Sequence, residues 1–191
     1  MEGEARRIAA SLQEHIPESR LRMPLAAEGA EAHAALELHV LIRFGQWDEI
    51  LSWPAKGDTT LYCATTSQRH FARGLAHAAL GRVEEARAEQ VAFRASLVVP
   101  TLTTRRVHNN MALKILEIAE EMLEGEILYR AGEHDAAFEK LAAGVSVATT
   151  PCRSLLSITT QDTSTKSSYR NLPSREGSDV DRRLVWTHRW R

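Results

Sequence analysis

The sequence predicts an all-α protein built from helical hairpins. Three observations lead to this prediction. Apolar residues recur at helical spacing through residues 1–149. No run alternates with a period of two over a length that would indicate a sheet, and two segments share one spacing of Gly and Ala, which is typical of repeated hairpins.

The expected helices are delimited by residues that cannot continue a helix. Pro lacks a backbone N–H, and Gly readily adopts the positive φ that closes a helix. Pro17 and Pro54 therefore mark two ends, and Gly45, Gly81 and Gly132 mark three more. We expect helices at 4–16, 26–44, 61–80, 83–97, 107–131 and 134–147, with a short helix from Asp48 that ends before Pro54.

The composition of the chain changes after Thr149. Residues 1–149 carry 16 basic and 21 acidic residues, whereas residues 150–191 carry 8 basic and 4 acidic ones and are rich in Ser and Thr. Such a segment buries too little apolar surface to offset its loss of conformational entropy. We therefore expect an N-terminal helix and linker at 1–25, a repeat domain at 26–149 and a disordered basic tail at 150–191.

An internal repeat relates residues 70–86 to residues 121–137 without gaps. Each copy has a Gly inside its first helix, a second Gly seven residues later and an Ala five residues after that. The equivalent pairs are Gly74 and Gly125, Gly81 and Gly132, and Ala86 and Ala137. The first Gly and the Ala would let helices approach closely, and the second Gly would end the first helix.

A third and weaker copy surrounds Gly45. The turn Gly and the acidic start of the second helix are kept, while Leu38 and Ile50 replace the two small residues. The turn glycines are 36 and 51 residues apart, against a hairpin repeat of about 34 residues. An insertion near residues 97–107 would explain the longer interval.

The stretches Gly-Arg-Val-Glu-Glu-Ala and Gly-Glu-His-Asp-Ala-Ala-Phe-Glu-Lys-Leu resemble the turn and second helix of tetratricopeptide repeats. The resemblance covers about residues 34–147. It implies a short right-handed solenoid that binds a protein or peptide on the concave face formed by the first helices. The chain departs from the family where His70 and Glu121 replace an early aromatic residue.

Six residues fall on or near this concave face in the expected register, and they are the candidate contacts for a protein or peptide. They are His39, Arg43, Phe71, Leu75, Glu126 and Arg130. The predicted function is that of an interaction scaffold, not of an enzyme, and no cofactor is expected.

Motifs for nucleotide binding, serine hydrolysis and zinc proteolysis are absent from the sequence. No two His residues of one predicted helix are spaced to chelate a metal ion. The alternative to a scaffold is a metal-binding or enzymatic helical protein that uses His and Glu between helices, for example His39 with His77. Cys63 and His70 could also be drawn as nucleophile and base, although a packed thiol is the simpler interpretation.

The balance of charge and hydropathy limits the partners. A net charge of -1 and a pI near 6.7 provide no basic field for nucleic acid. Arginines and tryptophans mix near the C-terminus, at Arg182, Arg183, Trp186, Arg189 and Trp190, but this stretch is short and isolated. The sequence has no long apolar run, which predicts that no segment spans a membrane. The chain has only two Cys residues, which is too few for a disulfide framework and predicts a cytoplasmic protein.

Helix 134–147 has an apolar arc wider than one contact requires, so another element should cover it. One explanation is a second subunit that packs there, which would make a homo-oligomer. The favoured explanation is that an exon change or frame shift after Thr149 replaced a natural continuation of the chain. A truncated product without activity of its own is a further alternative to the scaffold.

Four glutamates form an acidic stripe at helical spacing in the predicted helix 107–131. They are Glu117, Glu120, Glu121 and Glu124. A solvated outer face is the favoured interpretation, and a surface for a basic partner is the alternative.

Overall fold

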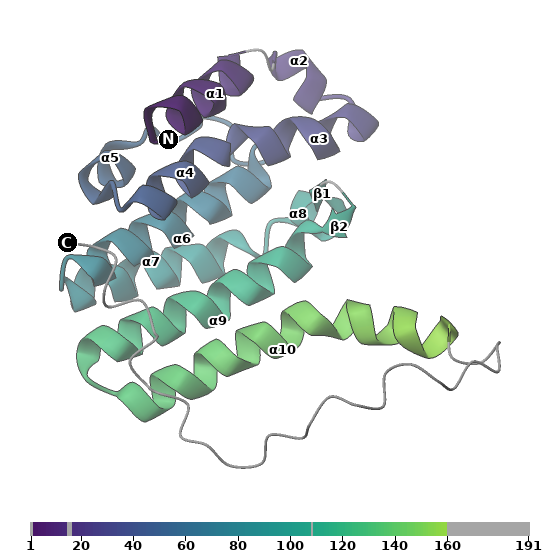
Figure 1. Ribbon diagram of the computed structural model, residues 1–191. Coiled ribbons are helices and arrows are strands. Elements are labelled where there is room, and N and C mark those ends of the chain that lie inside the picture. Colours follow the sequence, from purple (N-terminus) through teal and green to yellow (C-terminus); the bar gives the residue numbers. More distant parts are fainter. Residues whose placement is uncertain (1, 15–16, 108, 160–191) are drawn as a thin grey trace. The chain divides into compact units, whose positions relative to one another are not determined.

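The computed structural model describes residues 2–14, 17–107 and 109–159, which are mostly helical (Figure 1). The chain divides into two compact units, Met1–Thr149 and Thr150–Arg191. The elements are α1 (Glu2–Glu14), α2 (Glu18–Leu21), α3 (Pro24–Ala34), α4 (Leu36–Phe44), α5 (Trp47–Ser52), α6 (Cys63–Ala79), α7 (Val83–Ser96), α8 (Pro100–Thr104), β1 (Arg106–Val107), β2 (Asn110–Met111), α9 (Ala112–Ala131) and α10 (His134–Thr159).

The helical class is confirmed, and most helices lie within a few residues of their predicted positions. Three helices differ. The helix expected at 26–44 is interrupted at Ala35, whose φ of -103° and ψ of 2° lie outside the α-helical region. α9 begins at Ala112 and not at residue 107, and α10 continues past residue 147 to Thr159. The disorder expected of the tail falls largely on residues 160–191, which lie outside the described residues.

The three turn glycines end their helices in the same way. Gly45, Gly81 and Gly132 have φ values of 67°, 75° and 89°, as predicted for Gly81 and Gly132. After each glycine, the next backbone N–H donates to the carbonyl five residues earlier, from Gln46 to Leu41 and equivalently from Arg82 and Glu133, at 2.9 to 3.0 Å. This hydrogen bond satisfies a carbonyl at the helix end. The weaker third copy of the repeat thus closes with the same local structure as the other two.

An insertion separates α7 from α9, where the repeat spacing predicts one. It consists of α8 and a small antiparallel ribbon, in which Arg106 pairs with Met111 and Val107 with Asn110. The Ala112 N–H then donates to the Arg105 carbonyl at 2.9 Å. Strands of two residues are too short to show an alternating pattern, which is why the sequence predicted helix here.

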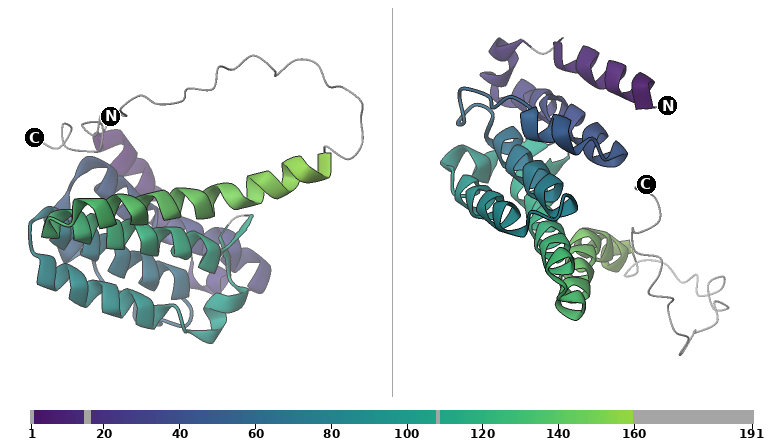
Figure 2. Two further views of the ribbon diagram at one scale, coloured as in Figure 1. Left: turned by 90° about the horizontal axis from the view of Figure 1, so that it is seen from below. Right: turned by 90° about the vertical axis from the view of Figure 1, so that its left-hand side faces the viewer.

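The order of the helices in the first unit follows the hairpins. α6 contacts α4 and α5 before it in the chain and α7 and α9 after it, and α7 also contacts α9. Figure 1 shows α4, α6 and α9 in succession, and in the left view of Figure 2 α10 runs alongside α9.

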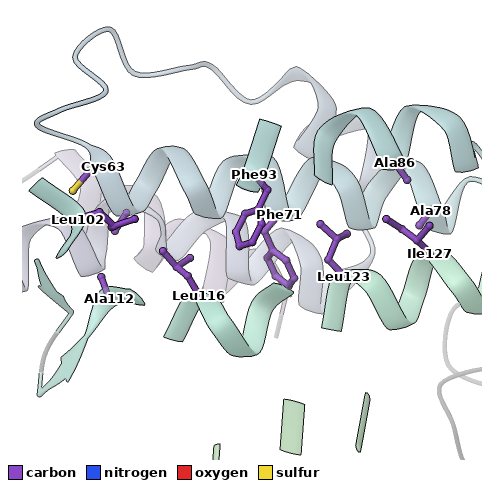
Figure 3. Packing of buried hydrophobic residues seen from close by; sticks show 11 residues of the cluster. Cys63, Phe71, Ala78, Ala86, Phe93, Leu102, Ala112, Leu116, Leu123 and Ile127 are labelled. Carbon is purple, nitrogen blue, oxygen red and sulfur yellow. The ribbon is translucent and has the colours of Figure 1, made fainter. Parts of the chain in front are cut away.

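The largest core cluster lies between α6, α7 and α9. Figure 3 shows Phe71 and Phe93 at its centre and Ile127 beside Ala78 and Ala86. Ala86 and its repeat equivalent Ala137 are both 0 % exposed, in agreement with the close helix contacts expected there.

Two glycines inside first helices allow close approach, as predicted. A Cβ placed on Gly74 would lie 2.8 Å from Leu123 Cδ1, and one on Gly125 would lie 2.8 Å from Leu141 Cγ and 3.2 Å from the Ala137 carbonyl oxygen. Real Cβ atoms do not approach other atoms so closely, so a larger residue would force its neighbours to move. At Gly74 the neighbour is the end of the Leu123 side chain, whereas at Gly125 it includes the backbone of α10, so Gly125 is the position that limits the distance between two helices.

We predict that Gly125→Val destabilises the fold by about 1–3 kcal/mol, because the added methyl groups overpack a contact that includes backbone. The matched control is Gly29→Ala in α3, where a Cβ would meet nothing within 4 Å. That control should raise stability by up to about 1 kcal/mol, since Ala is the better helix former. Urea unfolding of both variants provides the comparison, and equal effects would contradict the close-approach role of Gly125.

Candidate functional site

The candidate contacts other than Phe71 occupy two repeat-equivalent rows. His39, Leu75 and Glu126 each stand six residues before the turn glycine of their hairpin. Arg43 and Arg130 each stand two residues before it. Residues four apart lie on one side of a helix, so the two rows follow one side of α4, α6 and α9. We call this surface the first-helix face.

The five side chains of the first-helix face differ in exposure and in their contacts. His39, Arg43 and Arg130 are exposed, and Leu75 and Glu126 are half-buried. The Arg130 Nε lies 2.9 Å from Glu126 Oε1, and its guanidinium lies 5.9 Å from the centre of the Tyr129 ring. Leu75 packs against the main core cluster. The face therefore offers exposed cations on α4 and α9 on either side of an apolar residue on α6.

Phe71 corrects the predicted set. It is 8 % exposed and belongs to the core cluster, with its ring centre 6.4 Å from that of Phe93. The physical reason is that Phe71 lies on the side of α6 that faces the core shared with α7 and α9. Phe71 is a core residue and is not available to a partner.

The acidic stripe of α9 is not one solvated face. Each glutamate lies near a basic side chain of the same chain: Glu117 near Lys114 at 2.8 Å, Glu120 near Arg94 at 2.7 Å, Glu121 near Lys140 at 3.3 Å and Glu124 near Arg87 at 2.8 Å. Arg87 and Arg94 belong to α7 and Lys140 to α10. Most of the stripe therefore joins helices within the chain.

Glu124 has the densest set of partners in the stripe. It accepts hydrogen bonds from Arg87 at 2.8 Å and from Gln90 at 2.6 Å, and Arg94 lies 3.3 Å away. Burial alone would raise the pKa of the Glu124 carboxyl, but these hydrogen bonds and cations bring it below its usual value. The charged carboxylate is thus the form that holds α9 to α7.

One contact between a basic and an acidic residue recurs in both hairpins with the two residue types exchanged. His70 Nδ1 lies 2.8 Å from Glu89 between α6 and α7, and Lys140 Nζ lies 3.3 Å from Glu121 between α9 and α10. Glu121 is the repeat equivalent of His70, and Lys140 is the equivalent of Glu89. The geometry of the hairpin is thus conserved between the copies, while the polarity is reversed.

Sequence reasoning missed a buried carboxylate on α3. Glu31 is 1 % exposed, and its Oε1 accepts the backbone N–H groups of Ala64 at 2.6 Å and Thr65 at 3.0 Å, in the first turn of α6. Its Oε2 lies 2.9 Å from Arg105 Nε, which comes from the insertion. Burial raises the pKa of Glu31, although these partners oppose the shift.

The partners of Glu31 explain why sequence reasoning missed it. Glu31 attaches α3 to the start of α6, and both α3 and α4 contact α1 and α6. Ala64 lies 33 residues away in sequence and Arg105 lies 74 residues away. A single Glu in an Ala-rich helix carries no local signal of such contacts.

The geometry of the described residues does not support the Cys63 nucleophile with a His70 base, or a metal site. Cys63 is buried, with its Sγ 3.8 Å from Glu31 Oε2, while His70 bonds Glu89. Among residues 2–14, 17–107 and 109–159, no three His, Cys, Asp or Glu side chains gather closely enough to hold a metal ion. None of the helices in this described part is both long and apolar enough to cross a membrane.

A pocket of about 430 Å³ lies between α1, α4, α5 and the segment after α5. Its lining residues are Ala10, Glu37, Leu41, Glu49, Ser52, Trp53, Pro54 and Lys56. The Trp53 indole N–H donates to Glu37 at 2.9 Å, Glu49 pairs with Arg6, and the Lys56 ammonium lies 5.5 Å from the centre of the Trp53 ring. These contacts satisfy the charged groups internally and attach α1 and the segment after α5 to the first hairpin.

We predict that Arg105→Met destabilises the fold by about 3 kcal/mol at pH 7, because the buried Glu31 carboxylate loses its cation. A buried acid with a raised pKa opposes folding more strongly as pH rises through that pKa. The loss relative to wild type should therefore shrink as pH is lowered through that raised pKa. Urea unfolding measures both effects, and the exposed Arg82→Met should stay within about 0.5 kcal/mol; a similar effect of both variants would contradict the role of Arg105.

A second prediction concerns the seam between α7 and α9. Glu124→Gln should cost about 1–3 kcal/mol at pH 7, because it removes charge-assisted hydrogen bonds. The pKa of Glu124 is lowered in the folded state, so the wild-type advantage should disappear as pH falls through that lowered value. Thermal or urea unfolding at pH 7 and at acidic pH tests this, with the exposed Glu117→Gln expected to change little.

Comparison with known proteins identified no relative of this chain. No protein-family model, curated protein or solved structure matches this sequence. Any function therefore has to be argued from the residues of this chain, and in particular from its internal repeat and the first-helix face.

Proposed function

We propose that this chain is an interaction scaffold of the tetratricopeptide type, which binds a protein or peptide on its first-helix face. The hairpins are α4 with α5, α6 with α7, and α9 with α10. In the proposal they stack as a short right-handed solenoid, and the side that carries His39, Arg43, Leu75, Glu126 and Arg130 is concave.

The observation that carries this proposal is the repeated closure and packing of the hairpins. The turns at Gly45, Gly81 and Gly132 share one hydrogen-bond pattern, and the paired glycines and alanines of the two clear copies lie at close helix contacts. The contact between a basic and an acidic residue, His70 with Glu89 and Lys140 with Glu121, occupies equivalent positions with the residue types exchanged. Agreement of turn, contact and pairing at one register supports a true structural repeat.

The sequence of helix contacts also supports stacking. In an array of hairpins, each first helix packs between the first helices of its neighbours, and each second helix also touches the next first helix. α6 contacts both α4 and α9, α5 contacts α6, and α7 contacts α9. These contacts leave one side of the first helices for a ligand.

The charges of the first-helix face indicate how a partner would be held. Arg43 and Arg130 occupy the same position in their hairpins, at the ends of α4 and α9 nearest the turns, and both are exposed. Guanidinium groups bind carboxylates with directional hydrogen bonds. A partner segment that crosses α6 would contact Leu75, and on its two sides it would contact Arg43 and Arg130. We therefore expect the partner segment to have an apolar residue flanked by acidic residues.

We predict that the double substitution Arg43→Glu, Arg130→Glu weakens partner binding about tenfold or more, because two attractive contacts become repulsive. Partners would first be recovered with the wild-type chain and identified by mass spectrometry, and their affinities would then be measured by titration.

The matched control is Arg20→Glu, Arg82→Glu, which changes the net charge equally at two exposed arginines outside α4, α6 and α9. Partners should bind this variant as they bind wild type, apart from a small general charge effect. If every recovered partner binds the Arg43→Glu, Arg130→Glu variant with unchanged affinity, the first-helix face is not the binding surface.

A further inference from the structure

The pocket beside Trp53 combines an aromatic side chain with two carboxylates. Its volume of about 430 Å³ is within the range of sites for small molecules. Glu37 of α4 and Glu49 of α5 line it together with Trp53, and Leu41 and Ala10 add apolar surface. An aromatic ring, negative charge and short apolar side chains are the surroundings that favour an organic cation.

A cation of the chain itself already lies at this pocket. The Lys56 Nζ is 5.5 Å from the centre of the Trp53 ring and 5.7 Å from the centre of the Tyr62 ring. Both distances are within the range of about 6 Å over which an aromatic ring attracts a cation. The position of this ammonium indicates which chemistry the two rings accept.

The Trp53 ring is held in place by groups other than Lys56. Its indole N–H donates to Glu37 at 2.9 Å, and its backbone carbonyl accepts a hydrogen bond from Arg69 at 3.2 Å. Trp53 is 6 % exposed and belongs to a core cluster that includes Ile50. The aromatic wall is therefore already formed before a ligand arrives, which lowers the cost of binding.

Lys56 lies in the segment between α5 and α6, where the chain is not helical. Its side chain is half-buried, and a Cβ on the adjacent Gly57 would meet nothing within 4 Å. A lysine side chain has several rotatable bonds, so its release returns conformational entropy. An external cation would thus displace the ammonium without moving a helix.

We propose that this pocket binds a small organic ammonium ion, and that Lys56 competes with that ion from within the chain. The bound ion takes the place of the Lys56 Nζ beside Trp53 and Tyr62. Glu37 supplies negative charge, and Leu41 provides an apolar contact for the alkyl groups of the ion. Lys56 turns toward solvent when the ion binds.

This site goes beyond the proposed peptide-binding function and does not depend on it, because none of the pocket residues belongs to the rows of the first-helix face. A chain that binds no peptide would still bind the ion. The test therefore uses the ion alone, with the purified full-length chain.

The probe is tetramethylammonium chloride, titrated while nuclear magnetic resonance follows the indole N–H signal of Trp53. This signal should shift to saturation, and sodium chloride at equal concentrations should not reproduce the saturation. The uncharged tert-butanol, of similar size, should bind at least about threefold more weakly, because the ring attracts positive charge. Tighter binding of Nα-acetyl-lysine methylamide than of tetramethylammonium would instead assign the pocket to a lysine side chain of a partner and overturn the assignment to a small ion.

Two substitutions in the pocket should act in opposite directions. Lys56→Ala should lower the dissociation constant of tetramethylammonium about two- to fivefold, because the internal competitor is removed. Glu37→Gln should raise it at least about threefold, because a negative charge is lost while an acceptor for the Trp53 N–H remains. Circular dichroism of both variants should match that of wild type.

The matched controls are Lys114→Ala and Glu117→Gln, which make the same changes of charge at an exposed pair on α9. Both should bind the ion as wild type does. The absence of a saturating shift in wild type and in Lys56→Ala overturns the proposal. Weaker binding by Lys56→Ala, or equal tightening by Lys114→Ala, overturns the role of Lys56 as a competitor.

Discussion

The arrangement of the second and third hairpins depends on the packing of α9 against α6 and α7. The core cluster between these three helices includes Phe71, Phe93 and Leu123, and the Leu123 side chain lies against Gly74. At the edge of this core, Glu120 and Glu124 of α9 pair with Arg94 and Arg87 of α7. The apolar contact and the ionic seam therefore join the same helices.

A second constraint acts at the other end of α6. The Glu31 carboxylate satisfies two backbone N–H groups in the first turn of that helix and faces Arg105 from the insertion. Burying a charge is costly, and the cation and hydrogen bonds offset that cost only when all of them are present. The insertion between α7 and α9 is thus more than a spacer, because it supplies the counter-ion that lets α3 attach to α6.

The internal repeat links the core to the first-helix face. The paired residues Gly74 and Gly125, and Ala86 and Ala137, are kept in both clear copies and lie at close helix contacts. The position six residues before each turn glycine varies instead, among His39, Leu75 and Glu126. Small residues kept at the close contacts and varied residues on the first-helix face are what the proposed scaffold requires.

The sequence alone determined the helical class, the hairpin turns and the close contacts at Gly74 and Gly125, because a positive φ, a missing side chain and a period of 3.6 are local properties. It also supplied six candidate contacts, of which Phe71 is buried and the other five stay predictions. Only the tertiary structure decided that Phe71 is core, that α3 and α4 are separate and that Glu31 meets Arg105. Each of these depends on which distant segment packs against the residue. The residues adjacent to it in sequence do not determine that contact.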